Sequence, residues 1–283
     1  MTELVETWTA DGMRLHGALD LSDKPSELIV DGVILFSGVG SNFYSSGLIN
    51  KIADDCVRAG ICALRVNTRG HDTVNTLKTR QGGALQGAAY EVIDDCRHDV
   101  AAWVEFLNDR GLQRIGLIGH SLGALKVLYS QAHSATDSVV ASIAVSPPRL
   151  NFELFNTGAK AADFKQSFRE ASELVAAGQG QMLFQALFPF PMIRSAKHFV
   201  DKYGPESRYD ILNFSSQVSS KTLITFGAVE LQTGGVAFEN LDQKLSQLDW
   251  SIVPQIETIP NADHFYSGLG AELTSVIGDF LKS

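Results

Sequence analysis

The stretch that decides the fold is IGLIGHSLGALKVL, residues 115–128. It opens with a short apolar run and continues, directly after Ser121, into a helix-like segment. A strand that turns at once into a helix places the residue at the turn on a tight, strained elbow. Glycines two positions before and after Ser121 remove side chains that would collide with neighbouring elements. The stretch therefore predicts a buried strand, an elbow with Ser121 at its tip, and a helix.

The same alternation extends over most of the chain. Apolar runs that predict strands are VILFSG, ICALRVN, RIGLIG and VVASIAVS, and segments of helical spacing lie between them near 44–59, 90–108 and 121–133. Continuous apolar strands separated by amphipathic helices are typical of a mostly parallel central sheet with helices on both faces. The first twenty residues differ, because two alternating segments around Asp11-Gly12 predict an N-terminal antiparallel hairpin. The sequence thus predicts an α/β fold.

The alternation is interrupted once. It stops at SPPRLNF, resumes at KTLITFGAVE, and ends with IVPQIETIP and a last helix. We interpret residues 150–218 as a helical cap inserted into a core of residues 1–149 and 219–283, and we expect cap helices near 160–177 and 191–203. Open α/β sheets bind ligands at the carboxyl ends of their strands, where this insertion lies.

The expected cap is rich in aromatic and aliphatic side chains around GQGQMLFQALFPFPM. Such side chains either hold the cap on the core or line a pocket beneath it. Phe184 and Phe188 are the candidates for substrate contact. We therefore interpret the cap as a lid over a largely apolar pocket.

Composition and charge limit the classes of partner. The chain has 283 residues, 45% of them hydrophobic, which suffices for a full core in one or two domains. Its formal net charge of −9 and isoelectric point near 5.2 argue against a nucleic-acid or anionic-membrane surface, which needs clustered Lys and Arg. We therefore expect a small-molecule substrate and no nucleic acid, while a homo-oligomer stays open.

The N-terminal residues, the apolar runs and the cysteines bear on location. MTELVETWTADG carries acids where a signal peptide carries positive charge, and no long apolar segment follows it. The longest apolar runs fall well short of the roughly 20 residues that a membrane-spanning helix needs. Cys56, Cys62 and Cys96 lack CxxC spacing and are odd in number, which argues against a disulfide framework and a zinc site. These features predict a cytoplasmic protein with no membrane span and no metal.

Ser121 matches the pattern G-x-S-x-G over residues 119–123. The pattern is short and also fits a helix N-cap serine flanked by turn glycines, so the other parts of the machinery decide. On the predicted elbow the hydroxyl is lifted out of the backbone. The N–H of Leu122 then lies at the helix N-terminus, where it can donate to an oxyanion. Ser121 is therefore the candidate nucleophile.

A serine nucleophile needs a base from elsewhere in the chain. His264, in IPNADHFYSG, lies on a loop between the last strand and the last helix, at the same sheet edge as Ser121. The other histidines lie in less suitable places: the hairpin (His16), expected helices or a helix end (His98, His133, His198), the NTRGHD loop (His71) and the position before the nucleophile (His120). His120 should point away along the elbow, and we keep it as a candidate substrate contact. His264 is the candidate base.

The histidine in turn needs an acid that fixes its tautomer and stabilises the imidazolium. Glu230 stands three residues beyond Gly227, in the turn after the strand TLITFG and at the same sheet edge. Asp263 is the rival, but a residue adjacent to His264 cannot readily place its carboxylate on the far ring nitrogen. Glu230 is therefore the candidate acid.

A second oxyanion donor should come from LFSGVGSNF, after the first strand of the parallel part. Gly38 and Gly40 let this backbone approach a substrate closely, and the Val39 N–H is the better placed donor. Glycine-rich turns also bind phosphates, but no Lys-Ser/Thr follows here and the spacing of a dinucleotide-binding fingerprint is missing. Val39 and Leu122 are therefore the expected oxyanion hole.

Five stretches together resemble the α/β-hydrolase superfamily, in particular serine esterases and lipases with a helical cap. They are SGVG, NTRGHD, GHSLGA at the elbow, GAVE for the acid and NADHF for the histidine, in the chain order Ser, acid, His. The resemblance spans nearly the whole chain. It implies Ser121 as nucleophile, His264 as base, Glu230 as orienting acid, Val39 and Leu122 as oxyanion donors, and no cofactor.

Two positions depart from the family pattern. Ser37 replaces the common histidine before Gly38, and Glu230 replaces the commoner aspartate, which lengthens the arm and demands a shifted backbone. The segment 67–90 is also longer than a simple connection. Within it, Arg69, His71 and Asp72 either line the entrance or form an ion pair that pins the loop, and we favour the ion pair.

The expected function is a serine hydrolase that cleaves a carboxylic ester through an acyl-enzyme, with a largely apolar acyl or alcohol group. An amidase, a lactonase or a hydrolase of carbon–carbon bonds runs on the same residues, because pocket geometry sets the leaving group. A non-catalytic ligand-binding homologue is the alternative outside the enzymes. It would usually lack one member of the constellation, and all members are present here.

Overall fold

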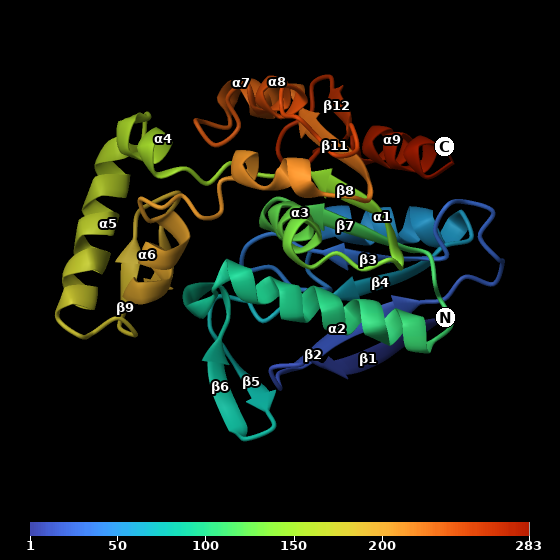
Figure 1. Ribbon diagram of the computed structural model, residues 1–283, viewed down its shortest axis with the longest axis horizontal. Coiled ribbons are helices and arrows are strands. Elements are labelled where there is room, and N and C mark those ends of the chain that lie inside the picture. Colours follow the sequence, from blue (N-terminus) through green and yellow to red (C-terminus); the bar gives the residue numbers. More distant parts are fainter. Residues whose placement is uncertain (283) are drawn as a thin grey trace.

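A central sheet forms the body of the computed structural model, which describes residues 1–282 (Figure 1). Its strand order is β1-β2-β4-β3-β7-β8-β11-β12. These strands are β1 (Thr2–Trp8), β2 (Arg14–Asp20), β3 (Gly32–Phe36), β4 (Cys62–Val66), β7 (Ile115–His120), β8 (Val139–Val145), β11 (Lys221–Gly227) and β12 (Gln255–Ile259). Neighbours from β4 to β12 are parallel, whereas β1–β2 and β2–β4 are antiparallel. The predicted parallel sheet with an N-terminal hairpin is confirmed.

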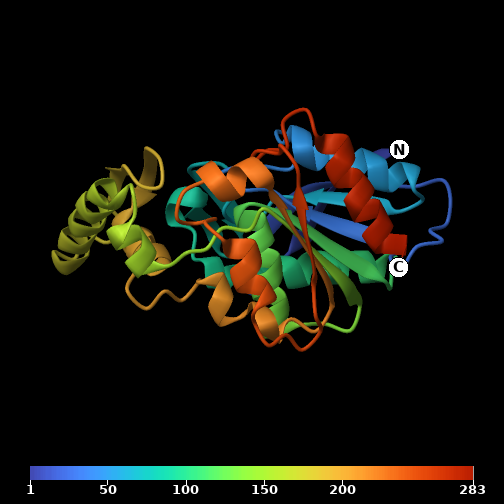
Figure 2. The ribbon, with the colours of Figure 1, turned by 90° about the horizontal axis from the view of Figure 1, so that it is seen from above.

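Helices cover both faces of this sheet. α1 (Gly47–Arg58) and α9 (Gly270–Lys282) lie on one face, and α2 (Cys96–Asp109) and α3 (Leu122–Ser134) lie on the other (Figure 2). Every residue of β3 and β7 is buried between these layers. Because both faces are covered, the central strands must be apolar throughout, which explains the continuous runs in the sequence.

Helix α2 begins later than the predicted range 90–108. Ala88–Tyr90 and Ile93–Asp95 form separate 3-10 turns, and the backbone of Glu91 between them is extended. The Glu91 side chain is buried and pairs with Lys126 on α3. The predicted range therefore covers the end of one 3-10 turn, a second 3-10 turn and the helix.

The segment between β4 and α2 contains a hairpin that the sequence did not predict. Its strands are β5 (Asn75–Thr79) and β6 (Gly82–Gln86), which pair antiparallel outside the central sheet. Most of their residues are exposed or half-buried, with Leu77 as the buried exception. Short, polar strands lack the apolar runs on which strand prediction depends.

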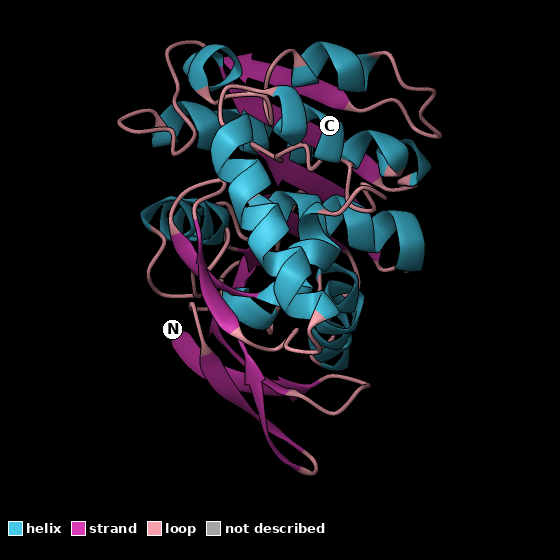
Figure 3. Cartoon of the chain, turned by 90° about the vertical axis from the view of Figure 1, so that its left-hand side faces the viewer, coloured by secondary structure: helices cyan, strands magenta, loops and turns pink. Residues whose placement is uncertain are grey.

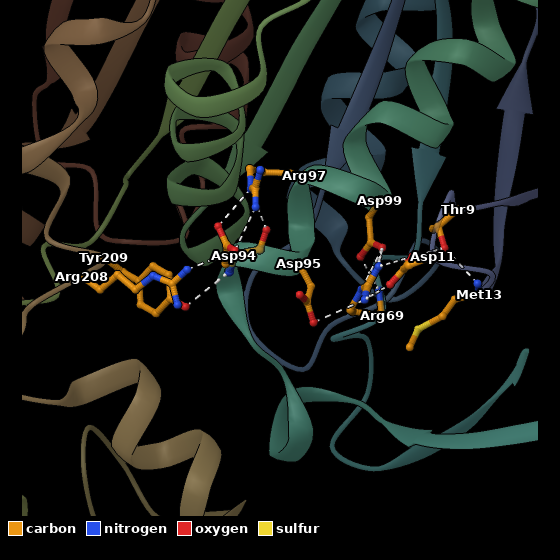
Figure 4. Close-up of polar contacts among 10 residues, drawn as sticks. All are labelled: Thr9, Asp11, Met13, Arg69, Asp94, Asp95, Arg97, Asp99, Arg208 and Tyr209. Carbon is orange, nitrogen blue, oxygen red and sulfur yellow. Dashed lines mark hydrogen bonds and ion pairs between the residues drawn. The ribbon is translucent and has the colours of Figure 1, made fainter.

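Arg69 anchors the start of this segment. Its buried guanidinium donates to Asp99 at 2.9 and 3.0 Å and to Asp11 at 2.8 and 3.1 Å, and its backbone N–H also donates to Asp99 (Figure 4). The arginine thus joins the first hairpin, the segment and α2. Its partners are Asp99, Asp11 and, at 3.4 Å, Asp95, which gives it a structural role. Asp72 instead accepts from Asn42 at 2.8 Å and lies 3.7 Å from His71 Nε2.

Residues 150–218, here called the cap segment, lie between β8 and β11 and outside the central sheet. They form α4 (Phe152–Thr157), α5 (Ala161–Ala176), a hairpin of β9 (Leu183–Ala186) and β10 (Met192–Ser195), and α6 (Ala196–Tyr203). Viewed from the side on which the cap segment lies, its helices stand in front of the sheet (Figure 3). α5 matches the helix expected near 160–177. The helix expected near 191–203 is shorter, because Met192–Ser195 form strand β10 and α6 begins at Ala196, and the four-residue strands of the hairpin were not predicted.

Aromatic rings form the interior of the cap segment. The Phe188 ring lies 4.7 Å from Phe155 and 5.0 Å from Phe164 between centroids. The Phe184 ring lies 5.5 Å from that of Phe199 on α6. These rings are buried and belong to the same apolar cluster as one face of α3. The interior of the cap segment is therefore continuous with the apolar core beneath it.

Candidate active site

Ser121 occupies the elbow between β7 and α3. Its backbone has φ 57° and ψ −124°, a conformation that residues other than glycine rarely adopt. The flanking glycines are needed for this turn, because a Cβ on Gly119 would overlap the carbonyl of Gly123 and a Cβ on Gly123 would overlap that of Phe36. Because strand β7 and helix α3 approach each other so closely, the Ser121 side chain projects from the turn between them.

Ser121 lies at one end of a hydrogen-bonded chain of three residues. His264 Nε2 lies 3.0 Å from Ser121 Oγ, and His264 Nδ1 bonds to Oε1 of Glu230. His264 lies on the loop between β12 and α9, and Glu230 lies in the first turn of α7 (Ala228–Thr233), directly after β11. The carboxyl ends of β7, β11 and β12 therefore supply all three residues, which are far apart in the sequence.

Glu230 is held on its second oxygen by two further donors. Oε2 accepts the Gly227 N–H at 3.2 Å and the Ser146 hydroxyl at 2.6 Å. Folding back onto Gly227 turns the longer glutamate arm toward the strand end, and Oε1 then meets the imidazole. Sequence reasoning did not identify Ser146, and its only signal is its place at the end of the run VVASIAVS.

Asp263, the rival acid, serves the turn beside the histidine. Its carboxylate accepts the backbone N–H groups of Phe265 at 3.0 Å and Ser267 at 2.9 Å. These backbone donors hold the pKa of Asp263 below its usual value. The side chain thus stabilises the loop that carries His264.

His120 supports the histidine loop from below the elbow. Burial, together with the nearby His264, lowers the pKa of His120 to about 4, so the ring is neutral. Its Nε2 lies 2.8 Å from the His264 carbonyl. A carbonyl only accepts, so Nε2 carries the proton and donates. His120 therefore fixes the loop, and its ring also contributes to the wall of the adjacent cavity.

The glycine-rich loop after β3 closes on the serine. A methyl group on Gly38 would lie 3.2 Å from Ser121 Cβ and 3.6 Å from its Oγ, so this backbone runs against the nucleophile. Val39 follows it and faces the cavity. Leu122 is the first residue of α3, where N–H groups have no partner within the helix. The two N–H groups expected to bind an oxyanion thus belong to backbone segments that flank Ser121.

A cavity of about 490 Å³ adjoins Ser121. Its wall consists of the loop after β3, the start of α1, the elbow and aromatic or imidazole rings, namely Gly38, Val39, Ser41, Ser45, Ser46, Gly47, Leu48, His120, Ser121, Phe190, His264 and Phe265. No Lys, Arg, Asp or Glu occurs among these wall residues. The site is therefore bordered by hydroxyl groups, imidazoles and apolar side chains.

The cap segment contributes Phe190 to this wall. Phe190 is 47% exposed, whereas Phe184 and Phe188 are 6% and 4% exposed and belong to the interior of the cap segment. The cavity wall does not include Phe184 or Phe188. An apolar run alone does not indicate which of its phenylalanines points outward, and the β9–β10 hairpin decides this.

The described part of the chain contains neither a candidate metal site nor a candidate membrane-spanning helix. Among residues 1–282, no group of three or more His, Cys, Asp or Glu side chains is arranged to hold a metal ion. Within the same range, no helix is both long and apolar enough to cross a membrane.

Comparison with known proteins places this geometry in a family. A family model described as the alpha/beta hydrolase family matches residues 33–268. No curated protein matches the sequence. Among solved structures, the alpha/beta hydrolase GrgF from Penicillium sp. sh18 is 17% identical with a TM-score of 0.74, over 100% of this chain and 98% of that one.

Two esterases show the same fold. Est1E from Butyrivibrio proteoclasticus, in a structure with bound ferulic acid, is 17% identical with a TM-score of 0.65, over 97% of this chain and 96% of that one. The Pyrococcus furiosus esterase Pf2001 is 18% identical with a TM-score of 0.60, over 100% and 92%. Because the family match covers most of the chain and includes the elbow and the histidine loop, this protein belongs to the alpha/beta hydrolase family and is a hydrolase.

Proposed function

We propose that the protein is a serine hydrolase that cleaves a carboxylic ester through an acyl-enzyme intermediate. The hydrogen-bonded chain from Ser121 through His264 to Glu230 carries this proposal. A nucleophile on a half-buried elbow that borders a cavity, a base 3.0 Å away and an acid on the far ring nitrogen are the parts that nucleophilic acyl transfer requires.

In the first half-reaction, His264 Nε2 takes the hydroxyl proton while Ser121 Oγ attacks the ester carbonyl. The N–H groups of Val39 and Leu122 hold the resulting oxyanion. His264 gives its proton to the departing alcohol, and the acyl group stays on Ser121. Water, activated by the same imidazole, then releases the acid and restores the serine, while Glu230 stabilises each imidazolium.

The cavity wall favours an uncharged substrate with apolar surface. It offers no ionised side chain to pair with a substrate charge, and burying an unpaired charge is costly. Phe190, Phe265 and Leu48 supply apolar surface within a volume of about 490 Å³, which is typical of small-molecule sites. Two structural neighbours are esterases, which supports an ester over the other acyl compounds.

The proposal is tested with a fluorophosphonate probe, which reacts with activated serines and needs no assumption about the substrate. We expect intact-mass analysis to show one adduct on the wild-type protein and none on Ser121→Ala. A folded wild-type protein that takes no adduct would contradict the proposal and favour a ligand-binding homologue.

The bond that is cleaved is tested separately on the unlabelled wild-type protein, with Ser121→Ala as the blank. A panel of 4-nitrophenyl esters, matched anilides, lactones and diketones distinguishes an esterase from an amidase, a lactonase and a carbon–carbon bond hydrolase. We expect turnover of the esters to be highest. Faster turnover of another class would keep the nucleophile and overturn the ester assignment.

Substitutions of two phenylalanines in the cap segment test where the apolar group of the substrate binds. Phe190 lines the cavity, so Phe190→Ala should raise KM by about tenfold through lost apolar contact while the melting temperature changes little. Phe188→Ala should instead cost about 3–5 kcal/mol of stability, because it leaves a void inside the cap segment. If KM is unchanged in Phe190→Ala, the substrate does not use this part of the wall.

A further inference from the structure

The last residue of β8 and the residue after it contact both ends of the Ser121–His264–Glu230 chain. The Val145 carbonyl accepts the Ser121 N–H at 2.9 Å. Ser146, the next residue, donates its hydroxyl to Glu230 Oε2 at 2.6 Å, and its N–H donates to the Thr225 carbonyl at 2.8 Å. Two consecutive residues therefore fix the elbow relative to the strand that carries the acid.

Ser146 has an unusual environment for a serine. It is fully buried, and its φ of 52° lies in the region that favours glycine. In this conformation its hydroxyl reaches Glu230 and also lies 3.1 Å from the Tyr266 hydroxyl. A strained backbone retained at a buried polar contact beside a candidate active site points to a role for that contact.

The hydrogen-bond directions around Ser146 follow from the number of protons. An ionised Glu230 only accepts, so Ser146 uses its single proton on the carboxylate. Tyr266 must then donate to Ser146, and Thr225, whose Oγ1 lies 3.0 Å from the Tyr266 hydroxyl, must donate to Tyr266. Burial raises the pKa of Tyr266, so the phenol keeps its proton. A directed series of hydroxyls thus runs from Thr225 to the carboxylate.

We propose that Ser146 is a positioning residue for the hydrolytic reaction, whose hydroxyl holds Oε2 of Glu230 so that Oε1 faces His264. This inference rests on the proposed serine-hydrolase function. A glutamate has one more rotatable bond than an aspartate, so its carboxylate loses more freedom when it is oriented. Ser146 and the Gly227 N–H together fix that carboxylate on one side and leave its other oxygen for the imidazole.

The test removes the hydroxyl in two ways. Ser146→Gly suits the positive φ, and Ser146→Ala keeps a side chain of similar size. We expect both variants to lower the rate of fluorophosphonate labelling and kcat for a 4-nitrophenyl ester by about 10- to 100-fold, with KM nearly unchanged, because a hydrogen bond to a charged group is lost. Tyr266→Phe removes the next donor in the series and should act in the same direction by a smaller factor.

A double-mutant cycle separates positioning from a general structural effect. If Ser146 acts through Glu230, the cost of Ser146→Gly should vanish in a Glu230→Gln background. The matched control is Ser142→Ala, which removes another fully buried serine, in the middle of β8, whose hydroxyl lies 2.7 Å from that of Ser220. We expect this control to leave the labelling rate at the wild-type value.

Each result has a separate meaning. Undiminished labelling of Ser146→Gly, or an equal loss in the wild-type and Glu230→Gln backgrounds, would overturn the positioning role. A loss in Ser142→Ala as large as in Ser146→Gly would do the same. Failure of the wild-type protein to be labelled would instead overturn the proposed function, so the two failures are distinguishable.

Discussion

Glu91 and Glu230 are two glutamates buried to the same degree, at 3% and 2% exposure, in opposite surroundings. Glu230 faces neutral donors, namely the Ser146 hydroxyl and the Gly227 N–H, and an imidazole that can gain a proton. Glu91 faces lysine and arginine side chains. The two buried glutamate carboxylates are therefore stabilised by different kinds of partner.

The cations around Glu91 come from both parts of the chain. Lys126, on α3 in the core, pairs with Oε1, and Lys202, on α6 in the cap segment, lies 3.7 Å from Oε2. Arg194 on β10 adds its field and donates to the Ala88 carbonyl. Burial alone would raise the pKa of Glu91, but these cations outweigh it and lower the pKa to about 2.

This difference separates a structural carboxylate from one suited to chemistry. The charge of Glu91 is already compensated by its lysine and arginine neighbours. These contacts join the cap segment to the core, and the carboxylate is not free to stabilise a charge that forms during a reaction. Among the described residues, no lysine or arginine forms a hydrogen bond with Glu230. A positive charge beside its carboxylate therefore arises only when His264 takes a proton. The same isosteric substitution at the two sites should therefore have opposite consequences.

The largest expected effect is on catalysis at Glu230. In the proposed mechanism, Glu230→Gln removes the charge that stabilises the imidazolium and the acceptor that fixes its tautomer. We expect kcat/KM to fall by about 10³- to 10⁴-fold, as for an acid in a serine triad, with a small change in melting temperature. The measurement is steady-state kinetics with the best ester of the panel, together with calorimetry. Retained activity would show that Glu230 is not the acid of the reaction, and the proposed difference between Glu230 and Glu91 would be wrong.

The next effect is on stability at Glu91. Glu91→Gln leaves Lys126, Lys202 and Arg194 without their common carboxylate. Breaking a buried ion pair by removing one partner costs about 3–5 kcal/mol, so the urea midpoint should fall strongly. Activity measured below the melting temperature should be retained, because Glu91 makes no contact with the Ser121–His264–Glu230 chain. A loss of kcat in the folded variant would mean that the two clusters are coupled.

Much of the fold is readable from the sequence because its signals are local. The elbow glycines of residues 119–123 and the continuous apolar strands each act within a few residues, and both predict elements that the structure contains. Ser121, His264 and Glu230 were chosen by their place after predicted strands, and parallel strands bring their carboxyl ends to one edge. Their hydrogen bonds depend on this shared edge, and their roles stay predictions.

The remaining features depend on contacts between distant segments. Ser146 reaches Glu230 because β8 lies beside β11, an order that no local pattern encodes. Lys126 and Lys202 are ordinary lysines in helical segments until the cap segment brings them to Glu91. Likewise, Phe190 rather than Phe188 faces the cavity because of a hairpin whose strands are only four residues long. Tertiary pairing decides these features, and short sequence windows do not contain it.

The smallest expected effect sharpens the comparison through pH. Burial, together with Arg194, lowers the pKa of Lys202 to about 7 despite the opposing field of Glu91, whereas an unfolded lysine titrates near 10.5. Between these values the unfolded chain binds more protons than the folded chain, so raising the pH stabilises the fold. In this window the slope from one such group is at most about 1.4 kcal/mol per pH unit.

Lys202→Met should remove this contribution while leaving Lys126 and Arg194 to compensate Glu91. We therefore expect the free energy of unfolding, from urea titrations at pH 7, 8 and 9, to rise less with pH in Lys202→Met than in the wild-type protein. All other titrating groups are common to both proteins and cancel in the difference. Parallel pH curves would mean that Lys202 stays charged in the folded state over this range. Glu91 would then be fully compensated from the cap side, and the contrast with Glu230 would become larger.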